Sequence, residues 1–540
     1  MKRGLRIGIA AVAGIAILGV AVPYAPVDFL KAPLERALER GLGRKVEVDA
    51  VSLTLFSGPG ASLDGVTIHD DPRAGIEPFA YANTLDARIS LLGLLHGRLE
   101  FSSLHLNDAT FNLVKPDNAP WNFEMLLHQT TPAASLPAIK VRGGRVNFKF
   151  AQNKSLLYFD DTDLDVSPRA DGAVELRFSG VPSRTDQSAQ NFGHFYVRGT
   201  AAPSLNLRVE LEPSALDAVA RLFDSRSAGL KGLLSLDAQL SGAPSALDVK
   251  GVLQLDGAGE WRVGYKGKLD LSAQTLELDS TSPPGLNTRL HVITRDLLTS
   301  PQWEVSANFL DASLGSAVDM ARKLGVPLPE KMIAEGVLSG TAHYRNTEGL
   351  GGNLEVRDAA LTMPDAAPLK IATATIFLKD KNIVAGPNTV QIGDQETADV
   401  EATYQAGDGG GIEMKIATRR MNIAELRSLN NAVPLLDRVT GGTWRGTLTY
   451  QQPLAAAGAW SGDFEVQNAS VVVDGIADPV HVQSASVTVN QGISVSRIRA
   501  KAGDIAFTGD YRWSTDNNQP QRFRLQISEA SSTEFERLFQ

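Results

Sequence analysis

Residues 205–212 read LNLRVELE, and this stretch decides the fold class. Apolar side chains alternate strictly with polar ones, and the alternation returns at residues 234–241, LSLDAQLS, and at residues 269–273, LDLSA. A period of two residues is typical of a β-strand with one apolar and one polar face. The apolar set supplies the candidates for the lining of a groove, which are Leu205, Leu207, Val209, Leu211, Leu234, Leu236, Leu240, Leu269 and Leu271.

A segment of a different pattern precedes the strands. Residues 29–40, FLKAPLERALER, place apolar side chains at helical spacing, and we expect a helix that Gly41 and Gly43 end. From Lys45 onward the period changes to two, and strand-like runs recur about every 8 to 14 residues with Gly, Asp or Asn between them. This spacing favours antiparallel meanders over βαβ units, so the sequence predicts a mostly β chain with short helices.

An internal repeat organises the second half of the chain. Residues 336–344, GVLSGTAHY, match residues 442–450, GTWRGTLTY, and residues 353–361, NLEVRDAAL, match residues 463–471, DFEVQNASV. The period is about 106 to 111 residues. Such repeats predict an elongated solenoid in which the sheet continues from unit to unit. Short segments with a helical pattern accompany the repeats at residues 214–223, 312–324, 423–429 and 533–540.

The N-terminus predicts a membrane crossing. Residues 7–22, IGIAAVAGIAILGVAV, carry no charge, and Lys2, Arg3 and Arg6 precede them. With the residues that follow, the run approaches the length of about 20 that a bilayer needs. The basic flank places the N-terminus in the cytoplasm and the bulk of the chain in the periplasm. A cleaved signal peptide and a buried core helix are the alternatives. The expected anchor side chains are Ile7, Ile9, Val12, Ile15, Ile17, Leu18 and Val20.

Composition and motifs exclude several function classes. The net charge of -9 argues against a nucleic-acid partner, and the lack of cysteine excludes disulfides, thiolate metal sites and thiol nucleophiles. The histidines are scattered, and no phosphate-binding loop or nucleophile elbow is present. Asp161, Asp163 and Asp165 alternate as calcium ligands do, but Val166 stands where such a loop needs glycine. We therefore expect solvent-facing carboxylates there, with no catalytic residue, metal or cofactor.

The first 130 residues resemble the AsmA family of bacterial envelope proteins, and the repeat region does so more loosely. The resemblance is carried by residues 28–31 (DFLK), 42–51 (LGRKVEVDAV), 56–82 (FSGPGASLDGVTIHDDPRAGIEPFAYA), 91–115 (LLGLLHGRLEFSSLHLNDATFNLVK) and 121–124 (WNFE). It implies an inner-membrane anchored periplasmic protein of outer-membrane biogenesis. It also implies a chorein-like start, a long antiparallel sheet curved into an open, taco-like groove, and phospholipids as cargo. Outer-membrane components are further expected partners.

The expected organisation runs from the membrane outward. Residues 1–27 form a cytoplasmic tip and signal anchor, and residues 28–129 an N-terminal unit of helix plus strands. A Thr/Pro/Ala/Ser-rich linker at residues 130–138 follows. The expected β units beyond it are 139–228, 229–330, 331–440 and 441–540, the last ending at a partial helix.

The competing functions differ in what covers the apolar faces of the strands. From the alternation alone, a closed sandwich or barrel is favoured, whereas the family resemblance favours an open groove filled by acyl chains. Burial is worth about 0.8 kcal/mol for each CH₂ group, so lipid tails could cover such a face. The leading hypothesis is therefore a lipid-conducting envelope protein. A non-conducting tether or assembly factor for outer-membrane proteins is the alternative, and an envelope hydrolase is the least supported.

Overall fold

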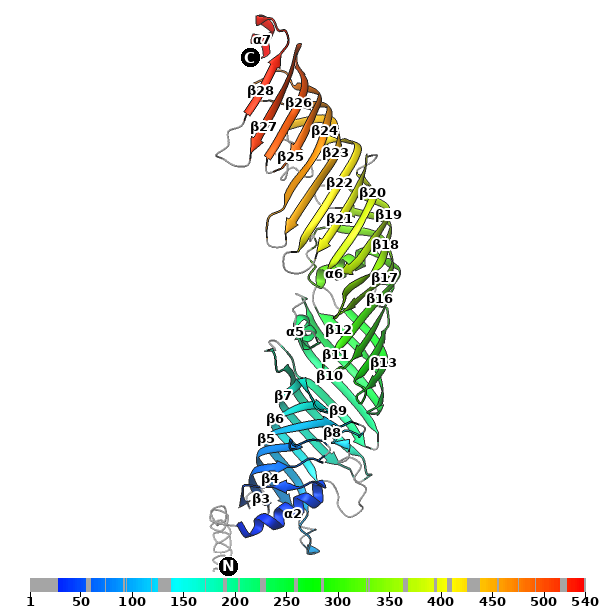
Figure 1. Cartoon of the computed structure of the whole chain (residues 1–540). Coiled ribbons are helices and arrows are strands. Elements are labelled where there is room, and N and C mark those ends of the chain that lie inside the picture. Colours follow the sequence, from blue (N-terminus) through cyan, green and yellow to red (C-terminus); the bar gives the residue numbers. More distant parts are fainter. Residues whose placement is uncertain are drawn as a thin grey trace, which may run out of the picture. The chain divides into compact units, whose positions relative to one another are not determined.

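The computed structural model describes the chain in segments between residues 28 and 538. The segments are residues 28–54, 60–72, 74–90, 93, 95–117, 119–124, 137–169, 171–187, 192–202, 204–223, 230–256, 261–282, 286–326, 328, 331–362, 368–392, 396–405, 410–424, 438–453, 456–473, 475–490, 492–514 and 522–538. They form strands β1 to β28 and few helices, so the prediction of a mostly β chain with short helices is confirmed (Figure 1). The expected anchor, with Ile7 to Val20, lies outside them, and no helix within them is long and apolar enough to span a membrane.

Two compact units make up the described chain, and the first takes in residues up to 284 with residues 290–305 and 323–325. Its helical segments are η2 (Asp28–Leu30), α2 (Lys31–Leu42) and α5 (Leu216–Phe223). Its strands are β1 (Val46–Glu47), β2 (Ala50–Thr54), β3 (Gly60–Ile68), β4 (Ala80–Ile89), β5 (Phe101–Lys115), β6 (Ala138–Phe150), β7 (Asn153–Pro168), β8 (Val174–Arg184), β9 (Phe195–Ala202), β10 (Leu205–Ala215), β11 (Leu233–Ala243), β12 (Ala246–Asp256), β13 (Trp261–Asp270), β14 (Thr275–Ser280) and most of β15 (Thr288–Arg295).

The second unit takes in residues 285–289, residues 306–322 and the chain from residue 326. Its helices are α6 (Leu314–Lys323) and α7 (Ser532–Leu538). Its strands are part of β16 (Gln302–Ser313), β17 (Ile333–Arg345), β18 (Gly349–Thr362), β19 (Leu369–Asp380), β20 (Asn382–Ile392), β21 (Glu396–Gln405), β22 (Gly411–Asn422), β23 (Val439–Pro453), β24 (Ala459–Val471), β25 (Val480–Val489), β26 (Gly492–Ala502), β27 (Ile505–Ser514) and β28 (Arg522–Ile527).

The strands of the first unit pair in chain order from β3 to β15, while β1 and β2 both pair with β3. The prediction of antiparallel meanders is wrong at one place, because β5 and β6 are parallel, with Ser103 opposite Ala138. Residues 116–137 connect these two strands, and a connection of that length lets the chain return to the start of β5. Among the described residues no pairing closes the sheet into a barrel.

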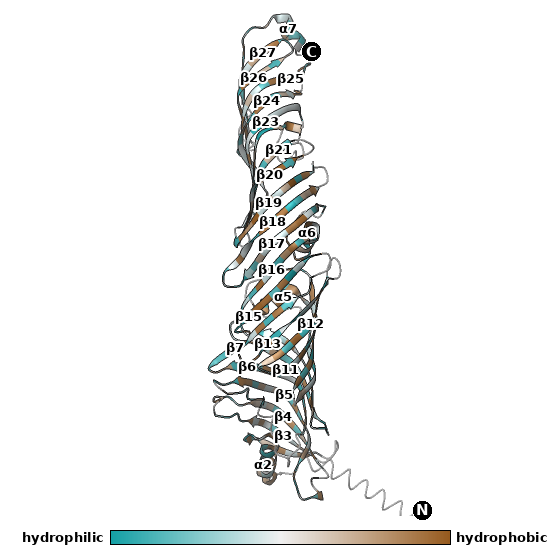
Figure 2. Ribbon diagram, turned by 90° about the vertical axis from the view of Figure 1, so that its right-hand side faces the viewer, coloured by the Kyte–Doolittle hydropathy of each residue, from teal (hydrophilic) through white to brown (hydrophobic). Residues whose placement is uncertain are grey.

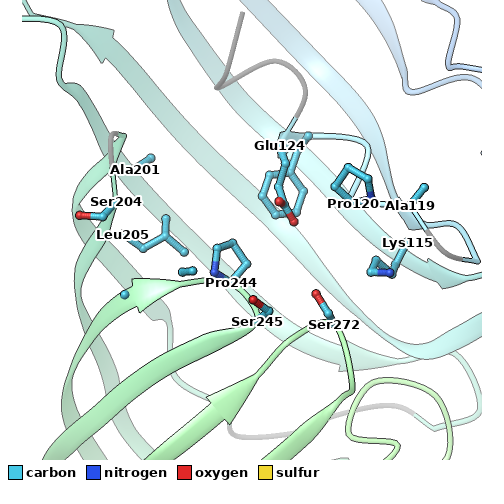
Figure 3. A pocket seen from close by; sticks show the side chains of 13 residues that line it. Lys115, Ala119, Pro120, Glu124, Ala201, Ser204, Leu205, Pro244, Ser245 and Ser272 are labelled. Atoms are coloured by element: carbon cyan, nitrogen blue, oxygen red, sulfur yellow. The ribbon is translucent and has the colours of Figure 1, made fainter.

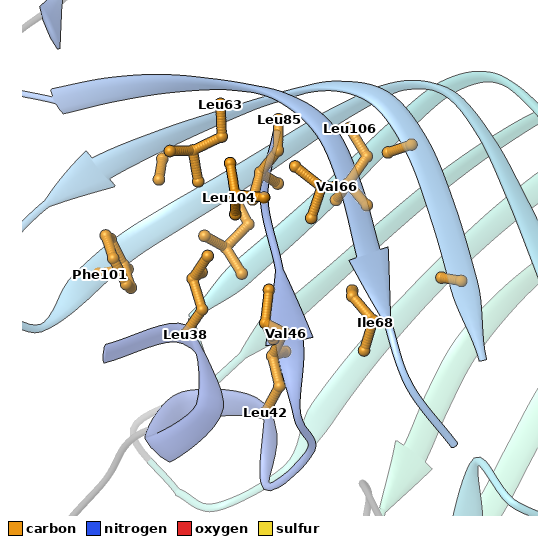
Figure 4. Close-up of a cluster of buried hydrophobic side chains, with 14 of the residues drawn as sticks. Leu38, Leu42, Val46, Leu63, Val66, Ile68, Leu85, Phe101, Leu104 and Leu106 are labelled. Atoms are coloured by element: carbon orange, nitrogen blue, oxygen red, sulfur yellow. The ribbon is translucent and has the colours of Figure 1, made fainter. Parts of the chain in front are cut away.

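Helix α2 covers the apolar face of β3 to β5. Leu38 and Leu42 of the helix pack with Leu63, Leu85 and Leu104 in a cluster of fully buried side chains (Figure 4). The helix runs two residues beyond the expected end, so Gly41 lies inside it. Gly43 ends it in the left-handed conformation, with φ of 65°, and its N–H donates to Glu39 O at 2.8 Å.

A buried network of polar side chains stabilises the first unit near the C-terminal end of α2. The guanidinium of Arg44 forms an ion pair with Asp70, and both side chains are almost wholly buried. Arg44 Nη2 also donates to Asn122 O at 2.5 Å, and the guanidinium lies 4.4 Å from the ring centroid of Phe79. Asn122 Nδ2 donates to Asp70 Oδ2 at 2.5 Å, while Asn122 Oδ1 accepts from Val114 N–H at 3.0 Å. The network joins the helix end to the β3–β4 connection and to the segment after β5.

The sequence repeat of the second unit has a structural cause at its glycines. Gly340 in β17 and Gly446 in β23 both have positive φ, 118° and 140°. A Cβ atom on Gly340 would lie 2.3 Å from Asn353 O, and one on Gly446 would lie 2.5 Å from Asp463 O. Because Asn353 and Asp463 are themselves equivalent in the repeat, both copies bring neighbouring strands together in the same way.

The predicted helical segments are mostly present. Helices α5, α6 and α7 lie within residues 214–223 and 312–324 and at residues 532–538. Of residues 423–429, only the first two are described, and they form a 3₁₀ turn. Strands β17 to β28 pair consecutively and antiparallel. Figure 2 shows that the strands labelled there carry both hydrophobic and hydrophilic residues.

Candidate functional site

The candidate site is the apolar face of the first unit. Cross-strand pairing aligns one residue from each strand, from β3 to β15, in a row that contains only apolar side chains and two glycines. We call it the apolar row, and its members are Ala61, Ala87, Leu104, Ile139, Val166, Leu176, Gly199, Leu207, Leu240, Val249, Gly267, Leu278 and Val292.

A polar row lies beside it on the opposite face of the same strands. Each member is next to a member of the apolar row in sequence, so its side chain points the other way. The members are Ser62, Asp86, His105, Lys140, Asp165, Arg177, Arg198, Arg208, Gln239, Lys250, Lys266, Asp279 and His291. The register therefore separates the two kinds of side chain completely along this line.

A second apolar line runs parallel to the first, two residues along each strand. It passes through Val209, Ala238, Gly251 and Tyr265 on β10 to β13. Gly251 has no side chain, but the hydroxyl of Tyr265 occupies the space beside it. The hydroxyl oxygen lies 2.5 Å from the position that a Cβ atom on Gly251 would take. Burial raises the pKa of Tyr265, so this hydroxyl stays neutral and adds no charge to the apolar face.

The structure brings the predicted groove residues together on this face. Leu205, Leu207, Val209 and Leu211 lie on β10, Leu234, Leu236 and Leu240 on β11, Leu269 on β13, and Leu271 directly after β13. Leu207 pairs with Leu240, and Leu211 pairs with Leu236. Leu205 is buried with Leu247, and Leu207, Leu240, Leu269 and Leu271 pack against them.

Sequence reasoning left the strand between these candidates out of the predicted groove lining. Leu247, Val249, Leu253 and Leu255 of β12 join the same face, opposite residues of β11. Val252 and Gly251 interrupt the alternation of this strand, which hid it. A period-two count that allowed these two exceptions would have added it to the lining.

Exposure differs between the two faces and along the apolar face. Arg208 and Lys250 of the polar row are exposed, whereas Leu207, Leu240 and Leu278 of the apolar row are half-buried. The described strands belong to a single sheet, and helix α5 contacts β8, β10 and β11. The apolar face beyond β6 therefore keeps hydrocarbon surface that the described part of the chain leaves partly open.

Phenylalanines broaden the apolar face at β6 to β9. Phe159 of β7 lies 5.2 Å from Phe178 and 5.3 Å from Phe195, measured between ring centroids. Phe148 of β6 lies 6.1 Å from Phe159. Such edge and tilted contacts hold the rings in a fixed arrangement without any polar group.

A cavity of about 500 Å³ opens where this face meets the segment after β5. Leu205 and Ser204 lie on one side, Lys115 and Glu124 on another, and Pro244, Ser245 and Ser272 complete the wall (Figure 3). The volume falls within the range of small-molecule sites. Its wall therefore offers apolar carbon, one cation, one carboxylate and several hydroxyls.

Ion pairs join some of the charges on the polar face. Arg208 Nη2 lies 2.6 Å from Asp237 Oδ2, and Arg198 Nη2 lies 2.7 Å from Glu210 Oε1. The hydrogen bond from Arg208 to Asp237 raises the pKa of the guanidinium, which stays charged. Of the alternating aspartates, which we expected to be solvent-facing carboxylates, Asp165 pairs with Arg142 and Asp163 accepts from Gly143 N–H. Within the described residues no cluster of His, Asp and Glu could hold a metal ion.

Comparison with known proteins found no matching family model, no similar curated protein and no similar solved structure.

Proposed function

We propose that this chain binds the acyl chains of phospholipids along its apolar face and passes them from strand to strand. In this proposal the chain is anchored in the bacterial inner membrane by residues 7–22 and serves outer-membrane biogenesis from the periplasm. The observation that carries the proposal is the apolar row, which no polar side chain interrupts from β3 to β15. The resemblance to the AsmA family supports the same function.

The dimensions suit a track better than a single binding pocket. Strands lie about 4.8 Å apart, so the row from β3 to β15 is on the order of 60 Å long when followed along the sheet. One bilayer leaflet is about 15 Å of hydrocarbon, which is half of the bilayer core. Several lipids could therefore lie along the row one after another.

Movement along the track follows from the kind of contact. Hydrocarbon burial is non-directional, so a tail that slides by one strand exchanges one apolar contact for another of similar free energy. A polar group in the row would break this equivalence. The described row holds none.

Site-specific crosslinking tests the proposal directly. A photoreactive amino acid replaces Leu240, on the apolar face, or Gln239, its neighbour on the polar face, in the full chain within cell envelopes. We expect phospholipid adducts at position 240 and none at position 239, detected by mass spectrometry. Adducts at neither position would reject lipid binding and favour the non-conducting tether.

A charge on the track tests movement separately from binding. Leu207→Asp and Leu240→Asp should lower lipid transfer between donor and acceptor vesicles at least about tenfold, since a carboxylate among acyl chains costs several kcal/mol. Gln239→Asp places the same charge on the opposite face of β11 and should leave the transfer rate unchanged. Equal transfer by all three variants would contradict the proposal.

A further inference from the structure

The cavity beside Leu205 lies where opposite ends of the strands meet (Figure 3). Lys115, the last residue of β5, and Glu124, in the segment after it, form one part of its wall. Three turns supply serines to the rest: Ser204 between β9 and β10, Ser245 between β11 and β12, and Ser272 between β13 and β14.

The two margins of the sheet, where strands begin and end, face each other at this cavity. β5 ends beside the end of β6 because these strands are parallel, and the strands from β6 to β15 then alternate in direction. The three turns therefore lie at the margin opposite to the end of β5. The hydrogen bond from Ser155 Oγ, near the start of β7, to Leu298 O, after β15, joins the same two margins. The sheet of the first unit thus curves round its apolar face, and the cavity lies at the seam between the margins.

One side of the cavity is continuous with the apolar face. Leu205 lines the cavity and is 9% exposed. Leu207 and Leu240 of the apolar row pack against the buried cluster to which Leu205 belongs. A molecule in the cavity can therefore place hydrocarbon on the apolar row while its polar part stays at the seam.

The cavity also holds one cation and one carboxylate with few partners in the protein. Lys115 and Glu124 are both half-buried. Among the described residues, Lys115 Nζ donates only to Pro116 O at 3.4 Å, Glu124 Oε1 accepts only from Trp121 N–H at 3.3 Å, and no ion pair includes either residue. One charge of each sign, each with hydrogen-bonding capacity to spare, complements a zwitterion.

Hydrogen bonds hold both parts of the wall in place. On the side of the turns, Ser272 N–H donates to Asp270 Oδ1 at 2.7 Å. On the other side, Asn122 N–H donates to Val114 O at 2.9 Å and fixes the segment that carries Glu124. A site that is ordered before its ligand arrives loses less free energy on binding.

We propose that this cavity binds the headgroup of a phospholipid that carries a phosphate and a primary ammonium group, as phosphatidylethanolamine does. Lys115 pairs with the phosphate, and the ammonium N–H groups donate to the carboxylate of Glu124. A choline headgroup has no N–H to donate, and a glycerol headgroup has no positive charge, so both fit the pair less well. The inference rests on the proposed function, because the acyl chains of the bound lipid lie on the apolar row.

The test is a competition among headgroups for one reporter position. The full chain, purified in detergent with a photoreactive amino acid in place of Leu240, is incubated with equal amounts of phosphatidylethanolamine, phosphatidylcholine and phosphatidylglycerol. We expect adducts of phosphatidylethanolamine to exceed those of each other lipid about tenfold, as one charge-assisted hydrogen bond allows. Glycerophosphoethanolamine, the same headgroup without tails, should not compete at the concentration of the lipid, because it gains no hydrocarbon burial.

Matched variants assign the preference to the two charges. Glu124→Gln keeps an acceptor for Trp121 N–H and should reduce the tenfold excess to about equal yields. Lys115→Gln should lower the adducts of all three lipids about fivefold without changing their ratio, since each lipid carries a phosphate. Glu210→Gln and Lys250→Gln remove the same charges from the polar face and should change nothing.

The outcomes separate this inference from the proposed function. Equal yields of the three lipids in the chain without these substitutions, or an excess that Glu124→Gln leaves intact, would overturn the headgroup site while lipid binding to the apolar face stands. Competition by glycerophosphoethanolamine as strong as that of the lipid would assign the cavity to a soluble zwitterion instead. Adducts of no lipid at position 240 would reject the proposed function and the headgroup site together.

Discussion

Two stretches of one sheet, β3 to β5 and β9 to β13, carry the same alternation and differ in what covers it. Over the first stretch lies α2, and Leu104 of the apolar row is 2% exposed there. Over the second, burial is mixed: Leu207 and Leu240 of the same row are half-buried, whereas Val249 is 8% exposed. Alternation in sequence therefore specifies the two faces of a strand, while the elements packed on the apolar face decide whether it becomes a dry core or stays partly open.

The largest expected effect comes from placing one charge in both stretches. Leu104→Asp should destabilise β3 to β5 by about 5 kcal/mol or more, because it removes core packing and buries an unpaired carboxylate. Leu240→Asp should cost only about 1 to 2 kcal/mol, since its side chain keeps access to solvent. Hydrogen exchange measured peptide by peptide reports each local opening in the full chain. Similar costs at the two positions would show that β9 to β13 is as well covered as β3 to β5.

The buried ion pair of Arg44 with Asp70 allows a second comparison, between a buried charge pair and one nearer the surface. Asp70→Asn leaves the guanidinium of Arg44 buried without its counter-charge, and we expect a loss of about 3 to 5 kcal/mol at the α2 end. The matched control is Glu77→Gln, which breaks the exposed pair of Glu77 with Lys154, whose atoms lie 2.5 Å apart. That change should cost about 0 to 1 kcal/mol. Protection of α2 amides from hydrogen exchange distinguishes the two, and equal effects would mean that the Arg44 network does not hold the cover in place.

The sequence was enough to predict the two faces of the strands, but it was a poor guide to the packing that covers the apolar face. Strict alternation at residues 205–212 and 234–241 located β10 and β11 and their apolar sides, because that signal is local. The parallel pairing of β5 with β6 depends on the path of residues 116–137, which no local period encodes. Asn122 and Asp70 are 52 positions apart in the sequence, so the hydrogen bond between them could not be predicted from a local pattern either.

The candidate site, too, could be predicted only in part. The nine predicted groove residues lie on one face, whereas β12 was left out of the predicted lining because Gly251 and Val252 disturb its period. Whether the sequence's single membrane crossing exists stays a prediction, since residues 1–27 lie outside the described chain.

The smallest expected effect concerns pH and the polar row beneath the covered stretch. Burial, and then the charges of Arg88 and Lys140, hold the pKa of His105 below its ordinary value of about 6.5. The unfolded chain therefore binds more protons than the folded chain as the pH falls from about 6.5 toward the lowered pKa. The stability that the neutral imidazole contributes is complete above about pH 6.5, declines through that window and is constant below it. His105→Gln should remove this slope from the protection of β4 and β5 amides while leaving their protection near pH 8 almost unchanged. A slope that persists in the variant would assign the pH dependence to another group and would show that His105 does not report on the covered stretch.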